Sequence, residues 1–304
     1  MIEEVNEMAK KPESNVFKTA LLFEGGSMRA SYTCAVAVRL LELGIYFDKV
    51  YSVSAGSSNC VNYLSRDIWR TKESFTGFIG GPDIGNYKTM LLGKGLFNAH
   101  YIYQEAGLPG GVLPYDFQTF QENPADCCVV SFDRDTGEDL YFTKKDMPTL
   151  NDLMVRVRAS STLPIVMPAP KVAGHVCYDG GFATGGGLPL RKIEADGYDR
   201  VVVIRTRKRG YRKSEGGAWA KRYFWNKPLM RDAVLTRWTR YNEACDLLDQ
   251  WEKDGRAWVF YADDITVDGT ERDVALLERN YQAGYAQILR DMPSLLEYVE
   301  AGEA

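Results

Sequence analysis

Short apolar runs and longer amphipathic stretches alternate along this chain. Runs rich in Val, Ile, Leu, Phe, Tyr and Cys predict buried strands, at residues 19–23, 47–53, 127–133, 139–143, 175–179, 200–206 and 257–261. Apolar residues that recur every three or four positions predict helices, at residues 28–43, 55–67, 150–161, 229–253 and 274–300. Strand, glycine loop, helix, strand, turn and helix follow one another over residues 19–67, which is the order of a βαβ unit. We therefore expect an α/β fold with a mainly parallel sheet.

The chain divides into three parts by composition. Residues 1–16 are a polar N-terminal segment, and residues 17–210 hold most of the strand pattern. Residues 211–304 predict a mostly helical C-terminal extension that packs on this core. Within the core, residues 70–125 are rich in Gly, Pro, Tyr and Asn and predict an irregular excursion that lines a pocket. Residues 127–143 predict a β-hairpin around the turn "RDTGE".

Composition and charge narrow the class of protein. With 304 residues, 45% of them hydrophobic and 26% charged, the chain is long enough for one large α/β core with an appendage. A net charge of −4 argues against a dedicated nucleic-acid binder. Residues 1–16 lack the apolar stretch of a signal peptide, and no segment reaches the ~20 apolar residues of a membrane-spanning helix. We expect a soluble, cytoplasmic protein.

The cysteines show no metal-binding or redox spacing. None forms a Cys-x-x-Cys pair, and they stand at positions 34, 60, 127, 128, 177 and 245. Cys127 and Cys128 adjoin in a predicted strand, so their side chains point to opposite faces. We expect reduced thiols that pack as small apolar residues. His175 and Cys177 share a strand face, but two groups do not make a zinc site, and no metal is predicted.

A serine follows the second predicted strand, in "YSVSAGSS" (51–58). A strand-to-helix turn that exposes a nucleophile needs small neighbours, which Ala55 and Gly56 provide. Ser52 stands where the usual Gly-x-Ser-x-Gly pattern has its first glycine. Ser54 is therefore a candidate nucleophile, and the alternative is an ordinary strand-ending turn.

The loop "EGGSMRA" (24–30) joins the first predicted strand to a helix. Such a loop leaves backbone N–H groups free beside the positive end of a helix dipole and can bind an anion. It could hold a nucleotide phosphate, serve as an oxyanion loop for Ser54, or simply cap the helix through Ser27. The nucleotide interpretation lacks both Gly-x-Gly-x-x-Gly and Gly-Lys-Ser/Thr.

The histidines argue against an acid–histidine relay. There are two, His100 and His175, and none follows position 175, whereas the α/β-hydrolase order places the histidine last. If Ser54 is activated, a carboxylate should do it directly. Asp179 is the candidate, because it ends a predicted strand and two glycines, Gly180 and Gly181, follow it. The Asp-Gly pairs at 254 and 268 are expected to be turns.

These pieces, taken in order, resemble the patatin-like phospholipase family. Its glycine-rich loop with a basic residue, its Gly-x-Ser-x-Gly elbow and its distant Asp-Gly-Gly correspond to "GGSMR" (25–29), "SVSAG" (52–56) and "DGG" (179–181). "ASSTLPIVMPAP" (159–170) also resembles the family, and the resemblance covers residues 17–210. The tail, at 205–213 and 241–260, resembles the extension of a bacterial subgroup of predicted patatin-like esterases.

The resemblance implies roles for particular residues. Ser54 would be the nucleophile and Asp179 its base. Arg29 would lie near the anionic part of the substrate. The oxyanion hole would be formed by the backbone N–H groups of Gly25, Gly26 and Ser27.

The resemblance also implies a fold and a reaction. The fold would be a three-layer α/β/α sandwich with a mainly parallel sheet. The reaction would be hydrolysis of an acyl ester or phospholipid through an acyl-enzyme, without a metal or organic cofactor. Two alternatives stay open: an esterase or thioesterase for small soluble acyl compounds, and a catalytically silent lipid- or protein-binding member of the fold.

Three positions depart from the family pattern. Ser27, Ala30 and Ser52 stand where glycine is usual. Each keeps its backbone N–H, but a positive φ at Ser27 would cost about 1–2 kcal/mol. One lost oxyanion donor costs roughly 10²–10³ in rate, so a slow or narrowly specific hydrolase is one outcome.

A basic stretch at 205–222 carries eight Lys and Arg against one acid, Glu215. With Tyr211, Trp219 and Tyr223 it could attract a membrane surface. The interpretation favoured from sequence is a solvated segment beside a helix.

Overall fold

The computed structural model describes residues 11–93 and 95–303. Residues 1–10, which make up most of the polar segment predicted at 1–16, lie outside the described residues.

A single mixed sheet forms the centre of the described part of the chain. Its eight strands lie in the order β5-β6-β3-β2-β1-β7-β8, with β4 beside β3. The strands that run parallel are β1 (Thr19–Phe23), β2 (Lys49–Val53), β3 (Asp126–Asp133), β7 (Arg200–Ile204) and β8 (Ala257–Phe260). The antiparallel additions are β4 (Asp139–Phe142), β5 (Lys171–Val172) and β6 (His175–Asp179). The predicted, mainly parallel sheet and the hairpin of β3 with β4 are confirmed.

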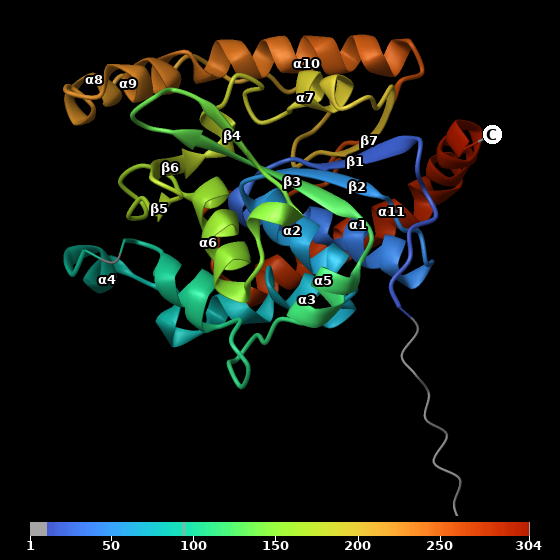
Figure 1. Ribbon diagram of the computed structural model, residues 1–304, viewed down its shortest axis with the longest axis horizontal. Coiled ribbons are helices and arrows are strands. Elements are labelled where there is room, and N and C mark those ends of the chain that lie inside the picture. The colour runs from blue at the N-terminus through green and yellow to red at the C-terminus, as the bar shows by residue number, and fades with distance from the viewer. Residues whose placement is uncertain (1–10, 94, 304) are drawn as a thin grey trace, which may run out of the picture.

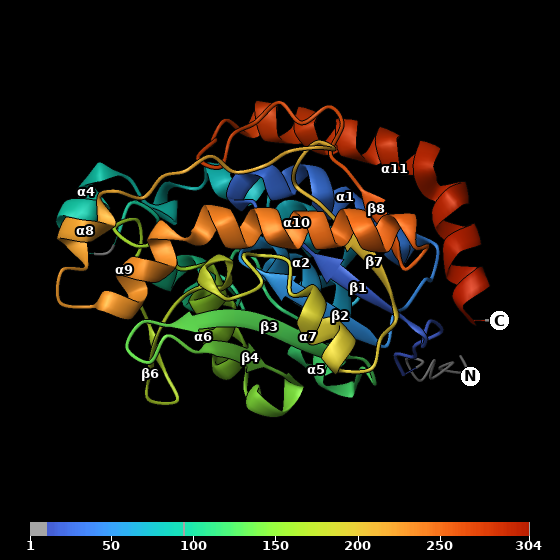
Figure 2. The ribbon, with the colours of Figure 1, turned by 90° about the horizontal axis from the view of Figure 1, so that it is seen from above.

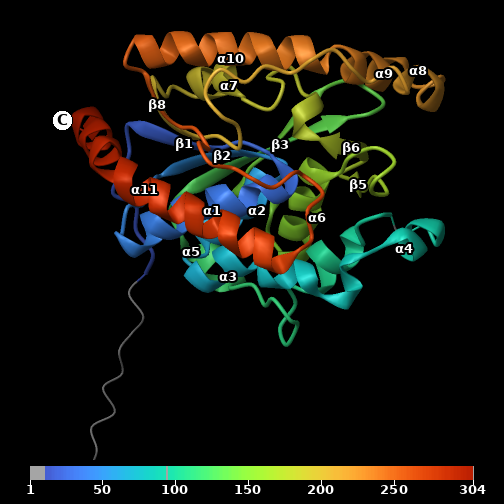
Figure 3. The same cartoon turned by 180° about the vertical axis from the view of Figure 1, so that it is seen from behind.

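Helices cover both faces of this sheet, so the molecule has three layers (Figure 1). One face is covered by α7 (Leu190–Ala195) and α10 (Arg237–Lys253). The other is covered by α1 (Ala30–Glu42), α2 (Ala55–Leu64), α6 (Leu150–Ser161) and α11 (Val274–Glu303), as Figure 3 shows from behind. The remaining helices are α3 (Ile68–Glu73), α4 (Tyr87–Leu91), α5 (Phe117–Glu122), α8 (Ala220–Tyr223) and α9 (Pro228–Leu235). The α/β/α sandwich is thus confirmed.

Strand side chains alternate between two hydrophobic cores. In β1, Leu21 packs with the helices of one face and Leu22 with those of the other. Cys127 and Cys128 point to opposite faces in the same way, as predicted. Because both faces are covered, the parallel strands are apolar along their whole length rather than at alternate positions. All six cysteines are free and buried.

The C-terminal part of the chain contributes to every layer. β8 pairs with β7 at the edge of the sheet, α10 crosses above the strands, and α11 lies behind β8 in the view from above (Figure 2). The helix predicted at 229–253 is two helices, α9 and α10, that meet at Thr236. The domain boundary at residue 210 stays a prediction. Among the described helices, none is long and apolar enough to cross a bilayer.

The segment at 70–125 contains more helix than its composition predicts. α4 and α5, together with turns of 3-10 and π helix, interrupt the irregular chain. Its apolar side chains form much of a third core cluster with α1 and α11, which is how a glycine-rich excursion stays fixed over the sheet.

Gly284 sets how closely α11 packs against α1. A Cβ atom at this position would lie 2.1 Å from the backbone oxygen of Tyr32. We expect Gly284→Ala to lower the free energy of unfolding by about 1–3 kcal/mol, although alanine is the better helix former. Urea denaturation measures the change. Gly216→Ala is the control, because no atom lies within 4 Å of its added Cβ. Equal stability of the two variants would contradict this account of the packing.

Candidate active site

Two strands that run in opposite directions meet end to end on one edge of β3. β2 pairs with the first part of this edge, where Val53 lies opposite Val130. β6 pairs with β3 immediately beyond, where Asp179 lies opposite Ser131, and β4 occupies the other edge. The last residue of β6 therefore faces the residue that follows β2, which is Ser54. The Ser54 side chain lies close enough to the Asp179 carboxylate to lower its pKa.

Ser54 lies on a sharp turn between β2 and α2. Its φ of 56° is in the left-handed region that non-glycine residues rarely adopt, a strain of about 1–3 kcal/mol. The turn is held because the Ser54 N–H donates to Ser160 Oγ at 2.9 Å, and Ser160 Oγ donates to the Val130 oxygen at 2.5 Å. A Cβ at Gly56 would lie 2.2 Å from the Phe23 oxygen, so a side chain there would push α2 away from β1.

Ser52 replaces the first glycine of the elbow without displacing the strand. Its side chain is fully buried in the sheet, and its hydroxyl lies 3.5 Å from the backbone oxygen of Cys128. The pairing of Ser52 with Phe23 and with Val129 keeps regular register. The fold therefore accommodates a Cβ at this position of the elbow.

Asp179 is a buried carboxylate with few partners. It is 1% exposed and accepts the Gly181 N–H at 2.7 Å. Burial raises the pKa of Asp179, while the Arg237 guanidinium at 4.0 Å, the nearby Ser54 hydroxyl and the hydrogen bond from the Gly181 N–H lower it. Burial prevails, so the pKa lies above the ordinary value of an aspartate. A raised pKa makes this carboxylate a stronger proton acceptor, as a general base requires.

The glycine loop lies directly against Ser54. Within the described residues, the backbone N–H groups of Gly25, Gly26 and Ser27 have no hydrogen-bond acceptor. A Cβ at Gly25 would lie 2.6 Å from the Ser54 Cβ, so only glycine allows this approach. Ser27 has a φ of 53°, so it holds the positive φ that is costly for a residue other than glycine. Ala30 begins α1 with ordinary helical geometry.

A buried carboxylate, Glu24, fixes the start of this loop. Its two oxygens accept the Thr206 N–H at 2.8 Å and the Tyr241 hydroxyl at 2.7 Å. Arg205, fully buried, lies 3.4 Å away and also donates to the Tyr241 oxygen at 2.6 Å. Burial raises the pKa of Glu24, but Arg205 and these hydrogen bonds outweigh it, so the pKa lies below its ordinary value. The carboxylate is held ionised between β1, β7 and α10.

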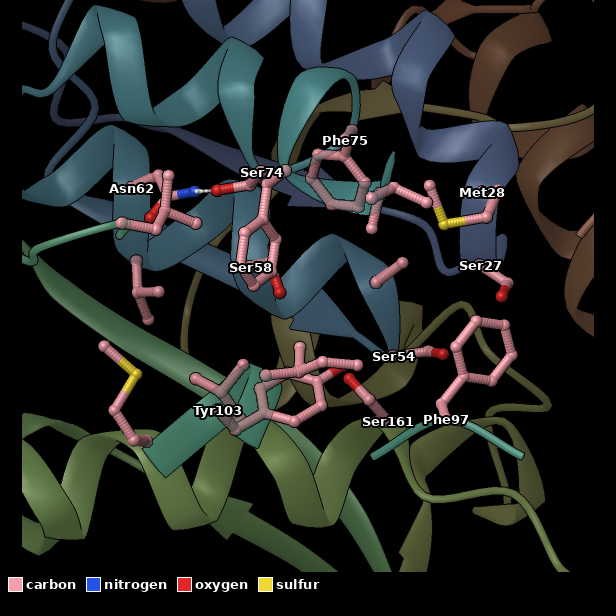
Figure 4. A pocket seen from close by; sticks show the side chains of 18 of the residues that line it. Ser27, Met28, Ser54, Ser58, Asn62, Ser74, Phe75, Phe97, Tyr103 and Ser161 are labelled. Carbon is pink, nitrogen blue, oxygen red and sulfur yellow. Dashed lines mark hydrogen bonds between the residues drawn. The ribbon is translucent and has the colours of Figure 1, made fainter. Parts of the chain in front are cut away.

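Ser54 also lies at the junction of two cavities. The first is apolar and runs beneath the excursion at 70–125, as that segment's composition predicted. Figure 4 shows Ser54 and Ser27 at one end of it and Asn62 at the opposite end. Its apolar wall includes Phe75, Phe78, Ile79, Phe97, Met154 and Val157. The charged Arg70 at its border donates to Asn62 Oδ1 at 3.0 Å and to the Leu113 oxygen, so its charge is already solvated by the protein.

The second cavity is polar and carries positive charge. Asp179 and Glu24 line it, together with the cations Arg29, Arg207, Lys213 and Arg237. Arg29 thus lies where its predicted role in binding an anionic group would require. Burial and then the neighbouring Arg237 lower the pKa of Lys213 to about 7.

Sequence reasoning missed three of the side chains around this site. Arg237 lies at the start of α10 and donates to the Gly181 oxygen at 3.1 Å. Ser160 lies near the end of α6, and its hydroxyl oxygen accepts the Ser54 N–H. No local motif marks either position. Lys213 belongs to the basic stretch at 205–222, whose favoured interpretation as a solvated segment needs correction. Within that stretch, Arg205 is buried and donates a hydrogen bond to the Tyr241 oxygen, while Arg207 and Lys213 line the polar cavity.

The two histidines lie away from this site. His175 pairs with Asp133 at 2.5 Å, and His100 is exposed beside Glu105 at 3.2 Å. Neither lines either of the two cavities. In the part of the chain that the structure describes, no group of three or more His, Cys, Asp or Glu side chains is placed to hold a metal ion.

Comparisons with known proteins show the family of the chain. Residues 21–190 match the family described as patatin-like phospholipase, and residues 227–300 match a domain of unknown function, DUF6363. No curated protein matches the chain. Among solved structures, VipD from Legionella pneumophila is similar, with 12% identity and a TM-score of 0.46, over 91% of this chain and 67% of that one.

The strain at Ser27 leads to a first prediction for the site. Ser27→Gly keeps the backbone N–H and removes the Cβ that disfavours a φ of 53°, so the free energy of unfolding should rise by about 1 kcal/mol. Ser27→Ala, which keeps the Cβ, is the matched control and should give no such gain. Thermal and urea denaturation measure both. A Ser27→Gly variant no more stable than Ser27→Ala would contradict the assignment of strain to this residue.

The Glu24 carboxylate leads to a second prediction, with a defined pH dependence. Because its pKa is lowered in the folded protein, the ionised form stabilises the fold above its unfolded pKa of about 4.3, and this stabilisation is lost as the pH falls through the folded pKa. Glu24→Gln should cost roughly 3–5 kcal/mol at pH 7, and the difference should shrink below about pH 4.

The control for Glu24 is an exposed carboxylate of the same type. Glu278 pairs with Lys72 at 2.8 Å on the surface, so Glu278→Gln should change stability by less than about 1 kcal/mol. Chemical denaturation from pH 3 to pH 7 measures both variants. A Glu24→Gln variant that behaves like Glu278→Gln would exclude a stabilising role for the buried network.

Proposed function

Because the chain belongs to the patatin-like phospholipase family, we propose that it is a serine acyl hydrolase that cleaves lipid esters with a Ser54–Asp179 dyad. The observation that carries the proposal is the meeting of Ser54 and Asp179 on one edge of β3, next to a loop with unpaired N–H groups. A serine with only a carboxylate beside it needs a buried, basic carboxylate, and Asp179 has that environment.

Acylation begins with attack of Ser54 Oγ on the ester carbonyl carbon. Asp179 accepts the hydroxyl proton as the new C–O bond forms. Negative charge develops on the carbonyl oxygen, which accepts hydrogen bonds from the N–H groups of Gly25, Gly26 and Ser27. The N-terminal end of α2, which begins at Ala55, adds a favourable dipole. When the intermediate collapses, the bond to the alcohol breaks and Asp179 returns its proton to the alcohol oxygen.

Deacylation repeats the same steps with water. Asp179 accepts a proton from a water molecule, whose oxygen attacks the acyl carbon of the Ser54 ester. The bond to Ser54 Oγ then breaks, and the proton held by Asp179 goes to that oxygen. The products are a carboxylic acid and the regenerated dyad, with no cofactor required at any step.

The apolar cavity supports a long acyl chain rather than a short one. Aromatic and aliphatic side chains line it from Ser54 inward, and burial of each methylene group contributes ≈ 0.8 kcal/mol. An esterase or thioesterase for small soluble acyl compounds would not need an apolar cavity that extends inward from Ser54. Equal kcat/KM on butyryl and longer acyl esters would favour that alternative.

We also propose that α8 and the residues after it contact a membrane surface transiently. Trp219, Tyr223 and Trp225 are 44%, 50% and 73% exposed, which is unusual for aromatic residues. Lys221 and Arg222 lie among them and add positive charge that would attract anionic lipid.

A fluorophosphonate probe tests the dyad directly. The wild-type protein should be labelled at Ser54, and Ser54→Ala should abolish labelling. Asp179→Asn should slow it by roughly 10³-fold or more, because the hydroxyl loses its proton acceptor. The labelling rate of the wild type should fall as the pH is lowered through the pKa of Asp179, which lies above that of an ordinary aspartate.

Matched variants separate loss of chemistry from loss of fold. Asp254→Asn changes an exposed Asp-Gly pair, and Ser294→Ala changes an exposed serine, so both should be labelled like wild type. Since burial raises the pKa of Asp179, its ionised form destabilises the fold, and Asp179→Asn should unfold at an equal or higher temperature at pH 7. A folded wild-type protein that is never labelled would favour the catalytically silent binding module.

A further inference from the structure

The two cavities meet at the nucleophile, so a bound ester is divided between them. Ser27, Ser54 and Leu163 line both the apolar and the polar cavity. An ester carbonyl at Ser54 has two substituents, the acyl chain and the alcohol. One of them must extend into each cavity.

The position of Asp179 decides which substituent goes where. Asp179 lines the polar cavity and is absent from the wall of the apolar one. The leaving alcohol oxygen must receive its proton from this carboxyl. The alcohol therefore extends into the polar cavity, and the acyl chain occupies the apolar one.

The polar cavity has more positive charge than its own carboxylates neutralise. Glu24 is already bound by Arg205, and Asp179 lies 4.0 Å from Arg237. Within the described residues, the side chains of Arg207 and Lys213 form no ion pair, and each lies over an aromatic ring. Arg207 lies 4.2 Å from the centre of the Tyr211 ring, and Lys213 lies 3.8 Å from that of Tyr241.

Arg29 adds a third cation, and no ion pair is found for it within the described residues. Its Nε is buried and has no hydrogen-bond partner in the described part of the chain. Burial and then the charge of Arg207 lower the pKa of Arg29, which shows that these cations are close enough to repel one another. Arg29, Arg207 and the protonated form of Lys213 face one cavity and favour a ligand that brings more than one negative charge.

We propose that the alcohol released by this enzyme carries a phosphomonoester, which Arg207 and Lys213 bind together with Arg29. The inference rests on the proposed function and specifies its substrate: an apolar acyl chain esterified to a small phosphorylated alcohol. Guanidinium groups match phosphate oxygens in geometry and charge, and a dianion meets the unneutralised charge of the cavity.

The same charges select against two related esters. A neutral alcohol would leave the cations without a counterion. A phosphocholine group has one negative charge and carries a quaternary ammonium, which Arg207 and Lys213 would repel. These two side chains already occupy one face of each of the nearby Tyr211 and Tyr241 rings.

Hydrolysis of three octanoyl esters of glycerol tests the proposed substrate preference. They are the 3-phosphate, the unphosphorylated ester and the 3-phosphocholine, each used at concentrations where it does not form micelles. We expect kcat/KM for the phosphate to exceed that for the neutral ester at least tenfold, and the phosphocholine to be the poorest. Arg207→Gln and Lys213→Gln should each reduce the ratio of phosphate to neutral ester by roughly tenfold. Equal rates on the three esters would overturn the proposal.

Arg209→Gln is the matched control. Arg209 is two residues from Arg207 but points to solvent and pairs with Glu252 at 2.7 and 2.8 Å. It should leave the ratio of phosphate to neutral ester unchanged. If Arg207→Gln and Lys213→Gln keep their thermal stability and also leave the ratio unchanged, these residues do not bind the substrate phosphate.

Calorimetry makes the test independent of turnover. Glycerol 3-phosphate should bind the wild-type protein, and it should bind the Arg207→Gln variant at least tenfold more weakly. It should also bind more tightly than inorganic phosphate, because the cavity also holds the alcohol. Inorganic phosphate binding alone, or no binding of either, would overturn the inference. Absence of fluorophosphonate labelling would instead overturn the proposed function, so the two failures are distinguishable.

Discussion

The buried carboxylate of Glu24 is the constraint on which the site depends. It follows β1 directly, at the start of the glycine loop, and accepts hydrogen bonds from Thr206 after β7 and from Tyr241 on α10. A charge in this position is tolerated only because Arg205 and these donors surround it. The same group therefore sets the direction of the glycine loop and attaches α10 to the core.

The approach of Ser54 and Asp179, the proposed dyad, depends on how two strands share one edge of β3. β2 and β6 approach each other along β3 from opposite directions, and their last residues pair with Val130 and Ser131. A parallel strand alone would carry Ser54 out of the sheet with no carboxylate facing it. The antiparallel β6 brings Asp179 to that point, and Gly180 lets the chain turn away, since a Cβ there would lie 2.3 Å from the Val130 oxygen.

Function and stability oppose each other at several of these residues. Ser27 and Ser54 hold strained backbone conformations, and Asp179 is buried with its pKa raised. The unneutralised cations of the polar cavity add mutual repulsion. Each feature costs stability and gives the site a property that the proposed reaction needs: an exposed nucleophile, a strong base, or affinity for an anion.

The sequence by itself determined the elements and the order of the chemical groups. Short, continuous apolar runs located the parallel strands. Both faces of these strands are buried, so they are apolar along their whole length. The glycine pair, the small residues around Ser54 and the Asp-Gly-Gly turn were local signals of close backbone approach. The lack of a late histidine pointed to a carboxylate base.

Only the tertiary structure decided which distant groups share the site. Arg237 reaches the Asp179 turn from a helix 58 positions later, and Ser160 supports the elbow from the end of α6. The basic stretch at 205–222 divides among a buried ion pair, surface pairs and the polar cavity. A charged residue has the same local sequence whether it faces water or a cavity, because that choice depends on contacts made by segments far apart in the chain.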